Sequence, residues 1–198
     1  MINKEISIEK KEREEYDPLP ENIYQVELID INDEEKPTYD TRNKADSEKE
    51  YETVLNFRFA LLGGKDKKGE SLRGRNIFVN FVPTYLYIGG KNGKNKLYQI
   101  VEAMIGRELT QEEEAGGIGT EYLNGLINKQ CRIGTKNSTK NDKTYSNADV
   151  FYPSESDSEP LSDEEKETQF KKKEENDTKF TQKDLEEDEI NVEDIPLN

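Results

Sequence analysis

The chain has 198 residues with 44 acidic and 29 basic side chains, so its formal net charge is −15, and only 31% of its residues are hydrophobic. Without histidine there is no imidazole base for serine or cysteine catalysis, and a single cysteine excludes an internal disulfide and a Cys/His zinc cluster. No apolar run is long enough to span a membrane or to act as a secretory signal, so we expect a soluble, cytoplasmic protein.

Charge is distributed unevenly along the chain. Residues 154–198 contain 17 acidic and 6 basic residues and few aromatic side chains. Such a segment buries too little apolar surface to offset its ordering entropy, which predicts a disordered acidic tail. In contrast, residues 51–100 carry a net charge of +6. We therefore expect a charged arm over residues 1–16, a folded domain over residues 17–153, and the tail.

Alternating apolar and polar residues predict three strands in the first half of the domain. These strands are expected over residues 22–31, 51–62 and 75–83. A polar, acidic loop is expected between the first two, over residues 32–50. Parity along the second and third strands predicts that Phe57, Phe59 and Phe81 lie in the core and that Arg58 faces solvent.

The apolar period then changes to that of a helix. Apolar residues recur at helical spacing over residues 96–105, and Gly106 is the expected C-cap. Thr110 followed by Glu113 has the form of a capping box, which predicts a short second helix. Two further strands are expected over residues 125–136 and 143–153. Three strands, a helical insert and two strands predict a mainly β protein with a five-stranded OB-like (oligonucleotide-binding-type) barrel.

Three stretches of the sequence carry a family resemblance: YDPLPENIYQVELIDI, LNGLINKQCRIGTKNSTKNDKTYSNADVFYP and EDEINVEDIPLN. The first two resemble the opening and closing strands of phage-type single-stranded DNA (ssDNA) binding proteins with an OB-like fold. The matching positions of the second are Leu123, Gly125, Cys131, Tyr145, Val150 and Pro153. The third is similar to the acidic tip of bacterial ssDNA-binding proteins.

The resemblance implies a non-enzymatic protein of a bacterial host cell that coats ssDNA without sequence preference during phage or mobile-element replication and recombination. It implies no cofactor and no membrane partner, and it leaves open whether the protein forms a homo-oligomer. The acidic tip is expected to dock replication or recombination enzymes. The candidate partner-binding residues are Asp188, Glu189, Glu193, Asp194, Ile195, Pro196 and Leu197. The rest of the tail is either a solvating spacer or a competitor that folds back on the basic groove.

Binding of ssDNA requires cations for the phosphates and flat rings on which the bases stack. The basic middle of the chain and the segment before the last strand supply both. The candidate residues are Arg58, Arg73, Arg75, Tyr85, Tyr87, Lys91, Lys94, Lys96, Lys136, Lys140, Lys143 and Tyr145. Alternative roles are that Tyr85 and Tyr87 cap the barrel and that the lysines only keep turns soluble.

Two other classes of function are weighed against ssDNA binding. An acidic DNA mimic that inhibits a basic nucleic-acid enzyme fits the net charge of −15 but not the basic middle. A metal-dependent nuclease would need carboxylates clustered on adjacent strands, and the sequence shows no such spacing. The carboxylates of residues 30–35 do not match the spacing of a calcium loop either, so they are expected to form a solvated loop. The lone Cys131 alternates with Arg132 on an expected strand, which favours a small buried hydrophobe over a reactive thiol.

Overall fold

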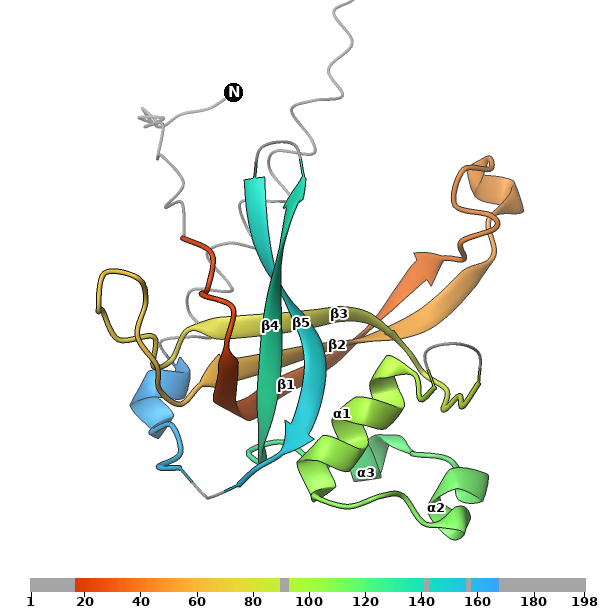
Figure 1. Ribbon diagram of the computed structural model, residues 1–198. Helices are drawn as coiled ribbons and strands as arrows, with labels where there is room; N and C mark the ends of the chain where they lie inside the picture. Colours follow the sequence, from red (N-terminus) through yellow and green to blue (C-terminus); the bar gives the residue numbers. More distant parts are fainter. Residues whose placement is uncertain (1–16, 90–92, 141–142, 156–157, 168–198) are drawn as a thin grey trace, which may run out of the picture.

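The computed structural model describes residues 17–89, 93–140, 143–155 and 158–167 (Figure 1). The strands are β1 (Ile23–Pro37), β2 (Tyr51–Leu61), β3 (Asn76–Pro83), β4 (Gln130–Lys140) and β5 (Lys143–Pro153). The helices are η1 (Asp46–Glu48), α1 (Lys96–Ile105), α2 (Gln111–Gly116) and α3 (Thr120–Asn124). The expected order of three strands, a helical insert and two strands is confirmed, and so is a mainly β protein.

The strands form one antiparallel sheet in the order β3-β2-β1-β4-β5, with β3 and β5 at its edges. β1 is central, because it pairs with β2 on one side and with β4 on the other. The β4–β5 hairpin runs crosswise to β2 and β3 in Figure 1. In the described part of the chain no strand ladder joins β3 to β5, so the sheet is open where the sequence predicts a closed barrel.

Two strands extend further than the sequence predicts. β1 continues to Pro37, because residues 32–37 of the expected loop pair with residues 51–56 of β2. β4 continues to Lys140, so the lysines expected in a loop lie on the β4–β5 hairpin. The ends of these two hairpins project from the sheet in Figure 1, and we call them the β1–β2 arm (residues 35–53) and the β4–β5 arm (residues 136–140 and 143–147). Alternation could not predict these extensions, because none of the added residues, 32–37 of β1 and 137–140 of β4, is buried.

The helix signals in the sequence are confirmed where they were strongest. Gly106 is the C-cap of α1, as predicted, and its φ of 72° lies in the left-handed region. Thr110 and Glu113 form the predicted capping box of α2. The short α3 lies in a glycine-rich stretch without helical periodicity and was not predicted. None of the helices in the described ranges is long and apolar enough to cross a membrane.

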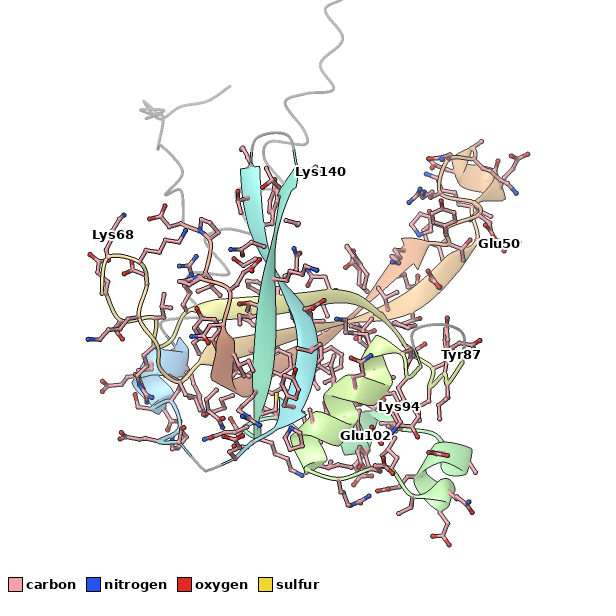
Figure 2. The ribbon with its side chains drawn as sticks, in the orientation of Figure 1. Glu50, Lys68, Tyr87, Lys94, Glu102 and Lys140 are labelled. Atoms are coloured by element: carbon pink, nitrogen blue, oxygen red, sulfur yellow. The ribbon has the colours of Figure 1, made fainter. Side chains whose placement is uncertain are left out.

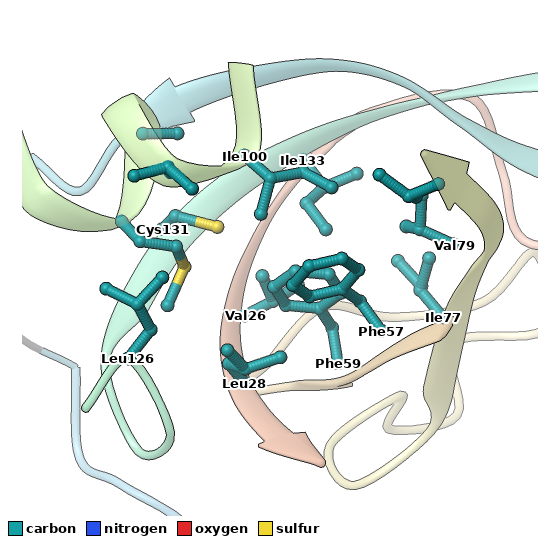
Figure 3. Packing of buried hydrophobic residues seen from close by; sticks show 14 of the residues in the cluster. Val26, Leu28, Phe57, Phe59, Ile77, Val79, Ile100, Leu126, Cys131 and Ile133 are labelled. Carbon is teal, nitrogen blue, oxygen red and sulfur yellow. The ribbon is translucent and has the colours of Figure 1, made fainter. Parts of the chain in front are cut away.

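The core lies between one face of the sheet and α1 (Figure 3). Phe57 and Phe59 are fully buried there, as predicted, with ring centroids 6.3 Å apart. Cys131 is also fully buried, as predicted, and burial raises the pKa of its thiol to about 12. Phe81, however, is 55% exposed, so its predicted place in the core is wrong.

A β-bulge in β3 explains the exposure of Phe81. Asn80 and Phe81 together lie opposite Asn56 of β2, where a regular register would place one residue. Phe81 has a left-handed φ of 60°, and its backbone N–H donates to Asn56 Oδ1 at 3.0 Å. The extra residue reverses the parity, so Phe81 faces away from the core on the same side as Phe78. Parity assumes an unbroken strand, which is why it misplaced this side chain.

Residues 158–167, which we call the strap, pack against the sheet. Leu161 of the strap is 3% exposed and lies on the side of the sheet opposite the core. The apolar cluster there contains Ile29, Ala60, Leu62 and Leu161. The predicted disordered tail from residue 154 is therefore wrong for the strap, because one buried leucine and a set of polar contacts hold this acidic stretch in place.

A buried ion pair fixes the strap to β1. Glu27 is fully buried, and its Oε2 accepts from the backbone N–H of Leu161 at 3.0 Å. Lys166 Nζ lies 2.6 Å from Glu27 Oε1. Ser162 and Glu165 cap the short helical turn that carries Lys166, since each side chain accepts from the other residue's backbone N–H. The strap is therefore ordered by both local capping and long-range contacts.

Candidate nucleic-acid interface

The side of β1, β2 and β3 opposite the core, which we call the outer face, carries an open hollow of about 410 Å³. Arg58 is central to this face, because it pairs with Asp30 of β1 on one side and Phe78 of β3 on the other. The strap covers the Ala60 end of the outer face. The hollow is lined by Asn32, Asp33, Glu34, Asn56, Phe57, Arg58, Phe78, Asn80 and Phe81. It therefore lies between the strap and the β1–β2 arm.

Two phenylalanine rings stand at this hollow. Phe78 is 53% exposed and Phe81 is 55% exposed. Lys36 Nζ lies 4.4 Å from the ring centroid of Phe81, and the guanidinium carbon of Arg58 lies 5.8 Å from that of Phe78. Exposed rings beside cations are the groups on which nucleobases stack. Neither ring was predicted as a site residue, although Phe78 occupies the outward parity of its strand, a signal that sequence reasoning could have used.

Arg58 lies on the outer face, as its parity predicts, but it does not face solvent. Its exposed fraction is only 3%, and Phe78 is one of the side chains that lie against it. The hollow opens onto Arg58. Arg58 therefore places positive charge at the base of the hollow, and the expectation of a solvent-facing side chain is wrong.

Amide and carboxylate groups line the hollow beside the rings. Asn56 Nδ2 donates to Glu34 Oε2 at 2.9 Å, and Asn32 Nδ2 donates to Asp30 Oδ2 at 2.8 Å. Groups of this kind hydrogen-bond to base edges. Their carboxylates repel phosphate, so the chemistry of the hollow favours a base over the backbone of a nucleic acid.

The two predicted arginines near the start of β3 contact other parts of the chain. Arg73 Nε donates to Glu165 Oε1 at 2.9 Å, and the terminal nitrogens of Arg73 donate to three backbone carbonyl oxygens, two of them in the strap. The hydrogen bond from Arg73 lowers the pKa of Glu165 to about 2. Arg75 donates to the carbonyl oxygen of Asp17. Both arginines thus hold chain segments together, and their phosphate contacts stay a prediction.

The two predicted lysines at the start of α1 also have protein partners. Lys94 Nζ lies 2.7 Å from each carboxylate oxygen of Glu102, and Figure 2 shows the two side chains next to each other. Lys96 Nζ donates to the carbonyl oxygens of Ala148 and Asp149 at 3.0 and 3.1 Å, and burial lowers its pKa. Lys94 therefore joins the segment before α1 to the C-terminal half of α1, and Lys96 joins α1 to β5.

The remaining described candidates are exposed and lie in separate places. Tyr85 and Tyr87 are 60% and 55% exposed in the segment between β3 and α1. Lys140, Lys143 and Tyr145 are exposed at the end of the β4–β5 arm. Lys136 is exposed further along the same arm, opposite Asn147. Figure 2 shows Tyr87 and Lys140 in different parts of the molecule. The predicted residues thus form several groups instead of one groove.

Some predictions fall outside the described residues. These are the residues 1–16 of the expected arm, Lys91, and the seven partner-binding residues between Asp188 and Leu197. Within the described ranges, no group of three or more His, Cys, Asp or Glu side chains is placed to hold a metal ion. Neither a protein-family model nor a curated protein sequence matches this chain.

Proposed function

We propose that this protein binds ssDNA and that Phe78 and Phe81 of the outer face stack on its bases. The observation that carries this proposal is a pair of phenylalanine rings, each more than half exposed, at an open hollow. Stacking on aromatic rings suits single strands of any sequence, because every base has a π-face. The left-handed backbone of Phe81 supports the proposal, since such strain costs about 1–2 kcal/mol and is concentrated at functional sites.

The arrangement of the strands supports an OB-like fold and a path for the DNA. The helical insert lies between β3 and β4, and in OB-like folds the ligand crosses the second and third strands and is held by loops at their sides. Lys140 and Lys143 on the β4–β5 arm are exposed and provide charges for phosphates. The β1–β2 arm provides a further exposed ring beside a cation. The guanidinium carbon of Arg42 lies 4.2 Å from the ring centroid of Tyr39, which is 74% exposed.

The wider role that we propose follows from the sequence resemblance. The protein coats ssDNA during phage or mobile-element replication and recombination, and it catalyses no reaction. Partner enzymes dock on its acidic tip around Asp194, Ile195 and Pro196. This role predicts that any affinity for such enzymes disappears when the tip is removed while the affinity for ssDNA persists.

The proposal is tested by fluorescence anisotropy of a labelled, mixed-sequence single strand. We expect salt-sensitive binding by the full chain and a dissociation constant about 5- to 150-fold higher for Phe78→Ala, since stacking contributes about 1–3 kcal/mol per base. Ile23→Ala is the control, because Ile23 is 49% exposed at the start of β1 and does not line the hollow.

Absence of binding at low salt would overturn the proposal. It would favour the acidic DNA mimic instead, which would bind a basic nucleic-acid enzyme and not the oligonucleotide. Equal binding by the wild type and Phe78→Ala would refute the role of the outer face.

A further inference from the structure

We propose that the β4–β5 arm binds a DNA duplex by placing one of its faces in the major groove, with Lys136, Lys140 and Lys143 on the phosphates. This site goes beyond the proposed binding of ssDNA on the outer face, because it adds a second ligand at a separate place. The lysines of the arm, which the proposed function assigns to phosphates, thereby receive a duplex as their partner.

The register of the β4–β5 arm gathers its lysines on one face. Lys140 of β4 lies directly opposite Lys143 of β5, and Lys136 precedes Lys140 by four residues. Directly opposite residues share a face of a two-stranded ribbon, and so do residues an even number apart along one strand. We call this face the basic face, and it consists of Lys136, Ser138, Lys140, Lys143, Tyr145 and Asn147.

The basic face keeps its positive charge available to a ligand. All three lysines are exposed, and none of them makes a hydrogen bond or an ion pair with another described residue. They differ in this from Arg73 and Lys94, which pair with Glu165 and Glu102. The six residues of the basic face include no carboxylate. Such a surface attracts a polyanion.

The other face of the arm packs on the chain segment that precedes β1. Asn137 and Ser146 lie opposite each other, and both side chains donate to the carbonyl oxygen of Leu19, at 3.1 and 3.3 Å. The backbone N–H of Asn137 donates to Glu21 Oε1 at 2.8 Å. These contacts hold the base of the arm in place, so binding of a ligand does not have to order it.

The arm has the width of a ribbon that enters the major groove. The ladder between β1 and β4 ends at the pair of Ile23 and Gly134, so beyond that pair the arm is two strands wide. The arm projects from the sheet in Figure 1, and Figure 2 shows Lys140 at its end. The major groove of B-form DNA is about 12 Å wide and admits a two-stranded β-ribbon.

The side chains of the basic face suit this groove. β4 supplies Lys136 and Lys140, about 13 Å apart along the strand, and β5 supplies Lys143. Cations on both strands of the ribbon can reach phosphates on both sides of the groove. Ser138 Oγ accepts from Asn147 Nδ2 at 2.8 Å, so its O–H stays available as a donor to base edges of any sequence.

The composition of the basic face favours a duplex over a single strand. A single strand is bound on aromatic platforms, and the outer face provides two exposed rings at its hollow. The basic face carries one ring, that of Tyr145, beside three lysines. Charge therefore outweighs stacking on the arm, which suits the dense and regular phosphates of a duplex.

The test measures the salt dependence of binding by fluorescence anisotropy, with a labelled, mixed-sequence DNA duplex and with a single strand of the same length. We expect the wild type to bind both. The test variant carries Lys136→Gln, Lys140→Gln and Lys143→Gln. Its slope of log K against log salt for the duplex becomes smaller by about 2.7, because each lost phosphate contact removes about 0.9. For the single strand, the slope changes by less than one contact's share of about 0.7.

The matched control carries Lys44→Gln, Lys65→Gln and Lys67→Gln. These lysines are exposed and lie outside the basic face, so the control loses the same charge but keeps the wild-type slope for the duplex. Phe78→Ala is the converse control, because we expect it to weaken binding of the single strand and to leave binding of the duplex unchanged.

A duplex RNA of the same sequence tests the placement in the groove. The major groove of A-form RNA is too deep and narrow for side chains to read, so we expect weaker binding of the RNA duplex than of the DNA duplex. Equal affinity for the two duplexes would overturn the placement of the arm in the major groove.

The remaining outcomes separate this inference from the proposed function. Absence of duplex binding by the wild type at low salt overturns the inference and leaves ssDNA binding intact. Equal changes of slope in the two triple variants, or equal changes for the duplex and the single strand, overturn the role of the basic face. Binding of the duplex without binding of the single strand overturns the proposed function and leaves this inference intact.

Discussion

Replacing Phe81 by asparagine separates the role of its ring in binding from its role in stability. Asparagine tolerates the left-handed φ of 60°, so the substitution relieves strain of about 1–2 kcal/mol. The ring is 55% exposed, so its loss removes only about half of the 1.5–3 kcal/mol that full burial of a phenylalanine contributes. Its contact with Lys36 adds about 0.5–1 kcal/mol. These opposing effects nearly cancel, and we expect the free energy of unfolding to change by less than about 1 kcal/mol.

Binding of ssDNA responds differently to Phe81→Asn. Loss of one stacked base removes about 1–3 kcal/mol of binding free energy, so the dissociation constant rises about 5- to 150-fold. Anisotropy measures the affinity, and urea unfolding followed by tyrosine fluorescence measures the stability, since the chain has no tryptophan. Phe81→Tyr is the control, because it keeps an aromatic ring at the same strained position.

Two results would refute this reasoning. If Phe81→Asn bound ssDNA as tightly as Phe81→Tyr, Phe81 would not stack on a base. If Phe81→Asn lowered the free energy of unfolding by more than about 2 kcal/mol, the ring would have a structural role that its exposure does not explain.

Two further predictions concern the strap. Lys166→Ala leaves the buried carboxylate of Glu27 without its cation, so we expect the free energy of unfolding, measured by thermal unfolding, to fall by about 3–5 kcal/mol. Lys166→Arg is the control and keeps most of the stability. An unchanged Tm for Lys166→Ala would contradict the buried pair. The pKa of Glu165 is lowered from 4.5 to about 2 by the hydrogen bond from Arg73, so the stability that this carboxylate contributes is complete above about pH 4.5 and is lost as the pH falls toward 2. NMR titration of the Glu165 carboxyl carbon checks this directly, and a midpoint near 4.5 would show that the contact with Arg73 does not persist in solution.

The elements of the fold were largely predictable from local patterns. Period-2 alternation placed β2, β3 and β5, and helical spacing with Gly106 placed α1. The capping box at Thr110 placed α2. These signals depend on residues a few positions apart, and they are present in the sequence whatever the tertiary structure. The polar stretches of β1 and β4 carried no such signal, because pairing with a neighbouring strand, and not burial of one face, makes them strands.

The candidate site was predictable only in part. Sequence reasoning identified a basic, aromatic region that includes Arg58, but it placed Phe81 in the core and overlooked Phe78. The bulge that turns Phe81 outward depends on the register of β3 against β2, which local parity does not contain. Whether a charged side chain such as Arg58 is exposed to a ligand also depends on the folded chain.

The sequence by itself determined that the chain has few hydrophobic residues, a basic middle and an acidic C-terminal region. Its local patterns also determined that the body is mainly β. The tertiary structure decided which of these charges remain available to a ligand. Arg73 is counted as a free cation in the sequence, yet it pairs with Glu165, 92 residues away, because the strap returns across the outer face. Such a contact depends on where distant segments meet, and no local pattern specifies that.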